Sequence, residues 1–285
     1  MRTRARPNPA PRHFATRLIA SAVVVCVVAI GVGRAGAAPI VVGKDAPLPH
    51  RILCAAPISL CHAHIDELLR RYVDDDGLVR YAEWKRDDLG QLDEYLNEMA
   101  HVESIGSRND SLAYWINVYN ALTIRAVLHF YPLQSIKEKA GVIGFNVWDD
   151  YRIAIGAEEY SLNRIEHEIL RRMGEPRIHF AIVCASIGCP RLRNEAYRAD
   201  HLDWQLDNDA RNFFARAWRL AVDPEKRSVR VSPIFNWFGE DFGGTDAAKL
   251  AFIARYAPES ARATLTTDRV KLSYLDYDWR LNERK

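Results

Sequence analysis

The chain has 285 residues, of which 48% are hydrophobic, and its formal net charge is +2. This length and apolar content are enough for one sizeable core, and the near-neutral charge gives no indication of a nucleic-acid partner. Residues 1–37 are typical of a secretory signal peptide, because arginines precede an apolar run over residues 18–32 and a small-x-small cleavage site at residues 35–37. We expect export to the periplasm or the extracellular space, with an uncleaved membrane anchor as the alternative.

Cleavage at this site leaves four cysteines, Cys54, Cys61, Cys184 and Cys189, in an oxidising compartment where disulfides persist. The short separation of Cys54 and Cys61 favours a disulfide between them. Cys184 and Cys189 can be bridged only if the loop between them folds back, since bridged Cα atoms lie about 5.5 Å apart. Residues 38–60 hold prolines without any period and predict a flexible N-terminal arm.

The rest of the chain predicts an α+β fold, with several helices packed around one small mixed sheet. Apolar residues at helical spacing predict helices over residues 62–72, 87–102, 112–130, 162–173, 202–214 and 246–256, with a short helix near Phe235.

Local signals predict where these elements begin and end. Ser111, Ser161 and Asp200 are predicted helix N-caps, and Gly174 is a predicted helix stop.

Strands are predicted at three places in the sequence. Residues 151–161 predict a hairpin that turns near Gly156, and residues 228–232 predict a short strand. The continuous apolar run 177–184 predicts a buried strand.

An acidic stretch, YVDDDGLVRYAE, resembles part of a calcium-binding EF-hand loop. Asp74, Asp76, Gly77 and Glu83 match its positions, but Tyr72 stands where the first carboxylate is required. A turn before a short strand fits the same residues, and we expect no metal and no cofactor.

Asn117 and Asn120 lie three residues apart on one face of a predicted helix, among apolar neighbours. Such amides are buried with fixed partners, because asparagine is a poor residue for a helix interior. Tying a neighbouring loop to the core is the usual role, and a place in a functional site is the alternative. His167 lies off the apolar stripe of its helix and His179 lies in an apolar run, so both are expected to be packing or surface residues.

Cys184 ends the predicted strand 177–184 and enters a loop of small residues, where functional groups are often placed. A buried or disulfide-bonded cysteine, a nucleophile, and a redox pair with Cys189 all remain open. Zinc binding is disfavoured, because no second Cys/His pair follows at the usual spacing.

Four motifs together, YWINVYNALTIRAVL, SLNRIEHEIL, IHFAIVCASIGCPRL and YDWRLN, resemble the family called domain of unknown function 547. The resemblance covers roughly residues 60–282 and implies one such domain over residues 61–285. His179 and Cys189 match only some members, which favours Cys184 with His167 over Cys184 with Cys189. Asn163 departs from the aspartate of many members. The recurring positions of the family match Asn117, Asn120, Glu166, His167, Cys184, Pro190, Asp278, Trp279 and Asn282.

The resemblance selects residues and carries no established reaction, but a cysteine, a histidine and buried asparagines are the parts of a cysteine-dependent hydrolase or acyl/amide transferase. A papain- or transglutaminase-like arrangement is the candidate fold. Cys184 would attack the acyl carbon of a peptide or an acyl or amide compound, His167 would carry the proton, and Asn117 or Asn120 would orient the imidazole. Glu166 stands beside His167 as a further candidate. A non-catalytic binding module and a thiol–disulfide protein that uses Cys184 and Cys189 are the alternatives.

Overall fold

The computed structural model describes residues 38–43, 62–102, 104–141 and 144–285, all of which lie in one unit of the chain, Ala35–Lys285. The predicted signal peptide, most of the predicted arm, Cys54 and Cys61 lie outside the described residues. Within the described part of the chain, no helix is long and apolar enough to cross a membrane.

The first sheet has the strand order β1-β2-β3. Strand β1 (Ile40–Val42) runs parallel to β2 (Tyr151–Ile155), which pairs antiparallel with β3 (Glu158–Ser161). The two later strands form the predicted hairpin, which turns at Gly156 with a positive φ of 60°. Residues 40–42 therefore form a strand within the stretch for which the sequence predicts a flexible arm.

Helices between residues 63 and 164 pack with this sheet around the first of two hydrophobic clusters. They are α2 (Ala63–Tyr72), α3 (Tyr81–Asp87), α4 (Leu89–Ala100), α5 (Arg108–Phe130), α6 (Val147–Asp150) and α7 (Leu162–Arg164).

Helix α5 is the centre of this cluster, since its residues 112–124 and 126–128 are all buried. A helix that is apolar on nearly every side belongs inside a core. Its N-cap is Ser107, which forms a capping box with Asp110, and not Ser111 as the sequence predicts.

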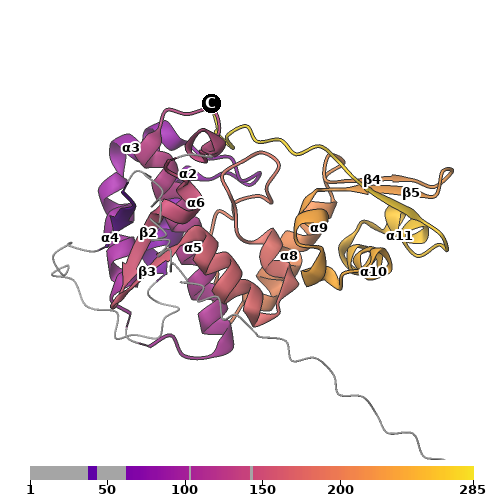
Figure 1. Ribbon diagram of the computed structural model, residues 1–285, viewed down its shortest axis with the longest axis horizontal. Coiled ribbons are helices and arrows are strands. Elements are labelled where there is room, and N and C mark those ends of the chain that lie inside the picture. Colours follow the sequence, from indigo (N-terminus) through magenta and orange to yellow (C-terminus); the bar gives the residue numbers. More distant parts are fainter. Residues whose placement is uncertain (1–37, 44–61, 103, 142–143) are drawn as a thin grey trace, which may run out of the picture. The chain divides into compact units, whose positions relative to one another are not determined.

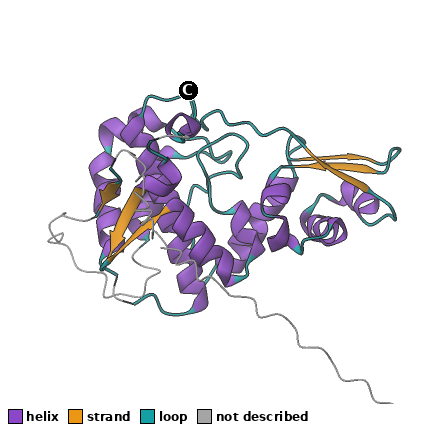
Figure 2. Cartoon of the chain, in the orientation of Figure 1, coloured by secondary structure: helices purple, strands orange, loops and turns teal. Residues whose placement is uncertain are grey.

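The second hydrophobic cluster is built from the last third of the chain, with a single contribution from the middle, Phe180. A second sheet, of order β4-β5-β6, belongs to this part of the chain. Figure 2 shows the strands as two separate groups, so the single sheet that the sequence predicts is in fact two small mixed sheets. The elements are α8 (Leu202–Phe214), β4 (Leu220–Asp223), β5 (Ser228–Val231), α9 (Ile234–Trp237), α10 (Asp246–Tyr256), α11 (Glu259–Leu265) and β6 (Lys271–Tyr274).

The apolar run 177–184 is not a strand, which corrects the sequence prediction. Residues Pro176–Phe180 form a 3-10 helix, and an irregular segment follows. Ile178 and Ile182 pack into the first cluster while Phe180 packs into the second. The run is buried on both sides because it lies between two clusters, so its continuous hydrophobicity does not require a sheet.

Two other local predictions have mixed outcomes. Ser161 caps α7 by accepting a hydrogen bond from the backbone of Arg164, as predicted. Asp200 does not cap α8, whose N-cap is His201, because the Asp200 carboxylate pairs with Arg198 instead.

The EF-hand-like residues form a turn. The Asp74 carboxylate accepts hydrogen bonds from the backbone N–H groups of Asp76 and Leu78, and Gly77 has a φ of 83°. A Cβ at Gly77 would lie 2.5 Å from the backbone nitrogen of Leu192, so only glycine allows this close approach. The turn therefore packs against the segment that follows Pro190.

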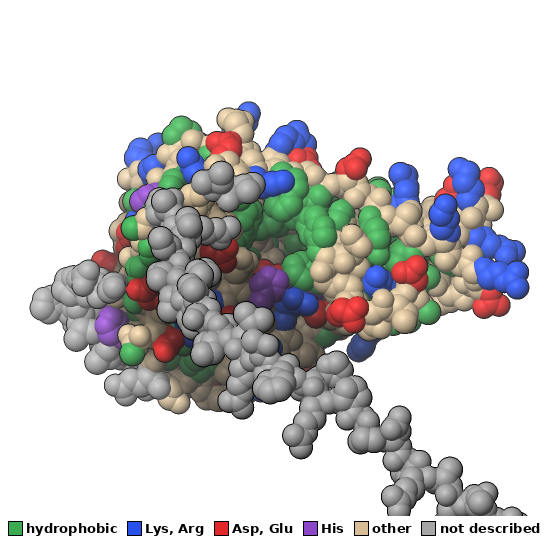
Figure 3. Space-filling view, in the orientation of Figure 1, with side chains coloured by type: hydrophobic (Ala, Val, Ile, Leu, Met, Phe, Trp, Pro, Cys, Tyr) green, Lys and Arg blue, Asp and Glu red, His purple; other side chains and the backbone are tan. Residues whose placement is uncertain are grey.

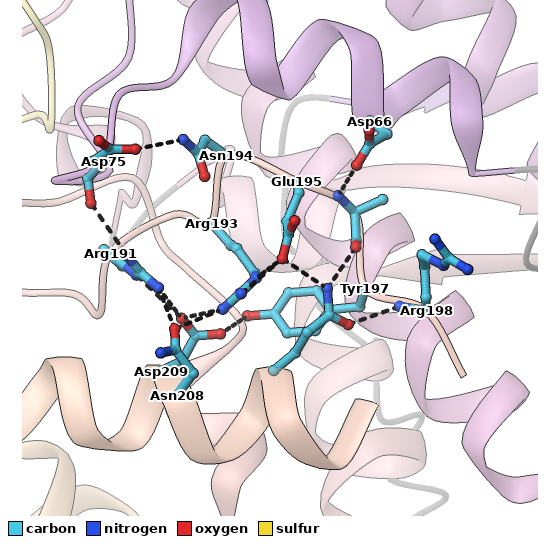
Figure 4. Close-up of polar contacts among 12 residues, drawn as sticks. Asp66, Asp75, Arg191, Arg193, Asn194, Glu195, Tyr197, Arg198, Asn208 and Asp209 are labelled. Carbon is cyan, nitrogen blue, oxygen red and sulfur yellow. Dashed lines mark hydrogen bonds and ion pairs between the residues drawn. The ribbon is translucent and has the colours of Figure 1, made fainter. Parts of the chain in front are cut away.

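Residues 191–198 are held between α2 and α8 by polar contacts (Figure 4). The buried carboxylate of Asp209 on α8 accepts hydrogen bonds from Arg191, Arg193 and the Tyr197 hydroxyl. At the other side, Asp66 on α2 accepts a hydrogen bond from the backbone of Ala196. These contacts fix the chain directly after the second cysteine.

Candidate functional site

The loop of residues 184–190, here called the cysteine loop, folds back on itself. Ala185 has a φ of 57°, a left-handed conformation that is rare for a residue with a side chain. The backbone N–H of Cys189 then donates to the carbonyl of Ser186 at 3.1 Å, and the backbone N–H of Cys184 donates to the Cys189 sulfur at 3.1 Å. The loop between Cys184 and Cys189 therefore folds back, as a bridge between the two cysteines requires.

The C-terminal segment, residues 276–283, holds the cysteine loop in this shape. The backbone N–H groups of Ile187 and Gly188 donate to the carbonyls of Arg280 and Asp278 at 2.9 and 2.8 Å. A Cβ at Gly188 would lie 3.0 Å from the Asp278 backbone, which leaves no room for a larger residue. Figure 1 shows this yellow segment running from the second sheet to the end marked C, near α2 and α3.

Four hydrogen-bond donors converge on the sulfur of Cys189. The Sγ atoms of Cys184 and Cys189 lie 2.7 Å apart, and the Cys184 backbone N–H is the second donor. The hydroxyls of Tyr277 and Ser186 lie 3.1 and 3.3 Å from the same sulfur. A sulfur with this many donors and little access to water is suited to carry a negative charge.

The two thiols consequently differ in acidity. The hydrogen bond to Cys189, desolvation and the neighbouring charge raise the pKa of Cys184 well above its usual value. Burial opposes ionisation of Cys189, but the hydrogen bonds from Cys184, Ser186 and Tyr277 outweigh it and lower the pKa of Cys189. The pair therefore loses its first proton at Cys189, and Cys184 remains the thiol donor.

Both cysteines line a pocket of about 280 Å³, here called the cysteine pocket. Its aromatic wall comes from Trp148 on α6, Trp237 on α9, and Tyr277 and Trp279 in the C-terminal segment. The Trp237, Tyr277 and Trp279 rings pack on one another with centroids 4.6–5.9 Å apart. Figure 3 shows hydrophobic side chains gathered between α6 and α9 on this face of the molecule.

Glu166 also lines the cysteine pocket, from a π-helical turn, Ile165–Leu170. Such turns insert one extra residue into a helix and are frequent at functional sites. The carboxyl group is buried and accepts a hydrogen bond from the Tyr119 hydroxyl at 3.3 Å. Burial raises the pKa of Glu166 to about 7, and the Cys189 charge adds to this effect.

Two histidines of the pocket are tied to an arginine and an aspartate. Arg171 donates two hydrogen bonds to the carboxylate of Asp241, which also accepts one from His179 Nε2 at 2.7 Å. Another Arg171 nitrogen lies 2.9 Å from His167 Nδ1. A guanidinium can only donate, so His167 Nδ1 accepts and the proton of the neutral ring lies on Nε2.

The pKa values of His167 and His179 agree with neutral imidazole rings. Burial and the Arg171 charge lower the pKa of His167. Burial likewise lowers the pKa of His179, although Asp241 acts in the opposite direction. Both imidazoles are therefore neutral at pH 7.

The structure places the residues selected from sequence in different roles. Cys184, His167 and Glu166 all line the cysteine pocket. Among the hydrogen bonds of the described residues, none joins His167 to Cys184. The expected imidazolium–thiolate pair is therefore replaced by a thiol–thiolate pair with Cys189, because burial and the Arg171 charge keep His167 neutral.

The two asparagines hold backbone, which is the usual role of such buried amides. Asn120 bonds to the Ala181 carbonyl and the Val183 N–H, at 2.9 and 3.0 Å, directly before Cys184. Asn117 makes the same two bonds to the backbone of Tyr197, at 2.9 Å each.

Sequence reasoning missed Tyr277 and underrated His179 with Asp241. Tyr277 lies 88 residues after Cys189, and no spacing rule connects them. The available signal for His179 was an imidazole in an apolar run, which burial alone explains equally well.

These features define the class of the protein: an α+β protein with a pair of cysteines at the edge of an aromatic-walled pocket. Residues 103–214 match a family described as "Protein of unknown function, DUF547". This match supports a DUF547 domain in that stretch, which includes both cysteines, Glu166 and His167. Comparison with curated proteins and with solved structures finds no match. The expected family residues Asp278, Trp279 and Asn282 lie beyond the matched stretch.

Proposed function

We propose that the cysteine pocket is a thiol–disulfide exchange site in which Cys184 and Cys189 alternate between a dithiol and a disulfide. The observation that carries this proposal is the separation of 2.7 Å between the two sulfurs. A disulfide bond is about 2.05 Å long, so closing the bond requires only a small movement within a loop that is already folded back. The co-reactant is a disulfide compound with an apolar or aromatic part that fits the pocket.

The exchange begins at Cys184, which is half-buried, whereas Cys189 is buried. The Cys184 proton passes to Cys189 along the hydrogen bond between them. Cys184 then attacks one sulfur of the substrate disulfide: a Cys184–substrate bond forms, the substrate S–S bond breaks, and the first substrate thiolate leaves and takes a proton from water.

The second step releases the other half of the substrate. Cys189 loses its proton and attacks the Cys184 sulfur; the intramolecular disulfide forms, the Cys184–substrate bond breaks, and the second thiolate takes up the proton. The protein is oxidised by two electrons and the substrate disulfide is reduced to two thiols.

Glu166 is the proton carrier of the second step in this proposal. It lines the same pocket, its charge and that of Cys189 act on one another, and its raised pKa allows it to accept and return a proton near neutral pH.

One observation favours a second candidate, the cysteine-dependent hydrolase or acyl transferase. His179 lines the pocket with Nε2 fixed on Asp241, and its Nδ1 has no hydrogen bond among the described residues. An imidazole oriented by a carboxylate is the usual base for activating a nucleophile or a water molecule. A peptide or acyl compound would be the substrate, and a papain- or transglutaminase-like arrangement belongs to this candidate.

Reaction with dithiodipyridine, a neutral aromatic disulfide, separates the two candidates. Trypsin releases residues 178–191 as one peptide that contains both cysteines. Exchange predicts that this peptide becomes two hydrogens lighter and carries no pyridine group, while Cys189→Ser traps a stable adduct at Cys184. Adducts on both cysteines of the unmodified chain would contradict exchange. Hydrolysis of nitrophenyl acetate that is lost in Cys184→Ala and in His179→Gln would support the hydrolase.

We further propose that the protein is exported and that Cys54 and Cys61 form a disulfide. The basic, apolar and small-residue order of the first 37 residues supports export. N-terminal sequencing of the mature protein is expected to give a start near residue 38, and a cytosolic protein that begins at Met1 would contradict export. Peptide mapping without a reductant tests the disulfide.

A further inference from the structure

A second pocket, of about 210 Å³, lies against the cysteine loop and is lined by Ser186, Ile187, Cys189 and Pro190 of that loop. Guanidinium groups provide its charge. We call it the arginine pocket, after Arg191, Arg216 and Arg219, which line it together with Asn212 and Trp218.

Arg219 is buried in this pocket without an acidic partner among the described residues. Its side chain is 6% exposed, it donates to the backbone carbonyl of Cys189, and its guanidinium lies 5.0 Å from the Phe213 ring centroid. Its Nε atom is buried and has no hydrogen-bond partner in the described part of the chain. A buried guanidinium that lacks a carboxylate partner and leaves its Nε–H unpaired is costly, so this group is incompletely satisfied.

The neighbouring arginines increase the positive charge and do not compensate for it. The Arg191 and Arg216 side chains already pair with the carboxylates of Asp209 and Asp76. Burial lowers the pKa of Arg219 to about 10; the Cys189 charge opposes this shift, and the charges of Arg216 and Arg191 add to it. Arg219 is still a cation at pH 7, in a pocket whose acidic groups are already engaged.

A second polar atom of the pocket is also without a partner. Asn212 Oδ1 is buried and accepts no hydrogen bond from the described residues. A donor and an acceptor therefore remain unpaired in the same small pocket, next to a guanidinium that pairs with no carboxylate of the described residues. This combination fits an oxyanion that also carries a hydroxyl or a protonated oxygen.

We infer that the arginine pocket is a binding site for a small oxyanion, a carboxylate or phosphate group, with Arg219 as its main cationic contact. The Cys189 thiolate raises the pKa of Arg219 through its charge, but no hydrogen bond joins the guanidinium to the Cys189 sulfur among the described residues. The hydrogen bond from Arg219 goes to the Cys189 carbonyl and not to its sulfur, which leaves the rest of the guanidinium available to a ligand.

Thermal unfolding and titration calorimetry of the full chain test this inference, with inorganic phosphate and acetate as probes at constant ionic strength. We expect phosphate or acetate, but not chloride, to raise the unfolding temperature. Arg219→Met should weaken binding at least about tenfold, because it removes a charge-assisted contact. Arg219→Lys should retain part of the affinity.

Arg230→Met is the matched control, because Arg230 is exposed on β5 and lines no part of the arginine pocket. It should bind as the unmodified chain does. Cys189→Ser removes the thiolate, and binding that persists in this variant shows that the site is separate from the cysteine charge. Equal effects of phosphate on the unmodified chain and on Arg219→Met, or no effect beyond that of chloride, would overturn the inference. If Arg219→Met does not fold, Arg216→Met takes its place: weaker phosphate binding than in the unmodified chain supports the inference, and equal binding overturns it.

Discussion

At the scale of single residues, the sulfur of Cys189 is stabilised by donors and not by an imidazolium. Cysteine thiolates often rely on a nearby histidine cation, but burial and the Arg171 charge keep His167 neutral. The Cys184 thiol and backbone N–H and the Ser186 and Tyr277 hydroxyls supply the stabilisation instead. Histidine substitutions should accordingly affect the ionisation of the pair less than loss of a hydroxyl does.

Tyr277→Phe is the direct test of this claim, because it removes one donor to Cys189 and leaves the ring. We expect the first ionisation of the cysteine pair to move up by about 1 pH unit. The measurement is the pH dependence of iodoacetamide labelling in the peptide of residues 178–191. Tyr274→Phe, whose hydroxyl contacts Lys249 and neither cysteine, should leave the midpoint unchanged. An equal shift in both variants would refute the assignment.

Glu166 has a consequence for stability. Its pKa is about 7 in the folded protein against about 4.3 in an unfolded chain. The folded state therefore binds this proton more tightly, and its contribution to stability is present at low pH and is lost as the pH rises towards and through 7. The Glu166 contribution to the free energy of unfolding therefore falls by about 2–3 kcal/mol between about pH 5 and pH 8.

Glu166→Gln should remove that loss, because the amide stays neutral at every pH. Urea unfolding at about pH 5 should give similar free energies of unfolding for the variant and the unmodified chain, and at about pH 8 the variant should be the more stable. Glu168→Gln, on the same helical turn but exposed, is the control and should differ little at either pH. A difference that does not grow with pH would mean that Glu166 is ionised in the folded protein.

At the scale of elements, α5 offers a matched pair of asparagines. Each makes two hydrogen bonds to buried backbone, but Asn120 holds the segment before Cys184 and Asn117 holds Tyr197. Either alanine variant should cost about 2–4 kcal/mol of unfolding free energy, because two backbone groups lose their partners.

Only Asn120→Ala should also slow disulfide formation between Cys184 and Cys189, measured as the rate of mass loss in the peptide of residues 178–191. Asn117→Ala should leave that rate unchanged at a temperature where both variants are folded. Equal rates in the two variants would show that Asn120 has no special role in positioning the loop.

The elements that the sequence predicted are those with long or local signals. The apolar pattern of α5, the hairpin at Gly156, and the Ser161 cap are all set by neighbouring residues, and the structure confirms them. The run 177–184 misled the prediction, because an apolar run does not distinguish a strand from another buried segment. Here the cause of its burial is two clusters on opposite sides, which only the tertiary fold reveals.

At the scale of the whole molecule, the site depends on segments that are distant in sequence. The cysteine loop is held by backbone bonds from Asp278 and Arg280 and by the Tyr277 hydroxyl. The sequence identified the cysteines, Glu166 and His167 as candidates, and all of them line one pocket. It favoured His167 over Cys189 as the partner of Cys184, but the actual choice depends on how the C-terminal segment folds the loop back, which local sequence does not show.

Equilibration of the full chain with mixtures of reduced and oxidised glutathione tests the central claim most directly. The peptide of residues 178–191 is analysed by mass after acid quenching. The account predicts a sigmoidal change from the dithiol to an internal disulfide between Cys184 and Cys189 as the mixture becomes more oxidising, with no lasting glutathione adduct. Persistence of two free thiols across the whole range, or adducts on either cysteine in place of the internal bond, would contradict it.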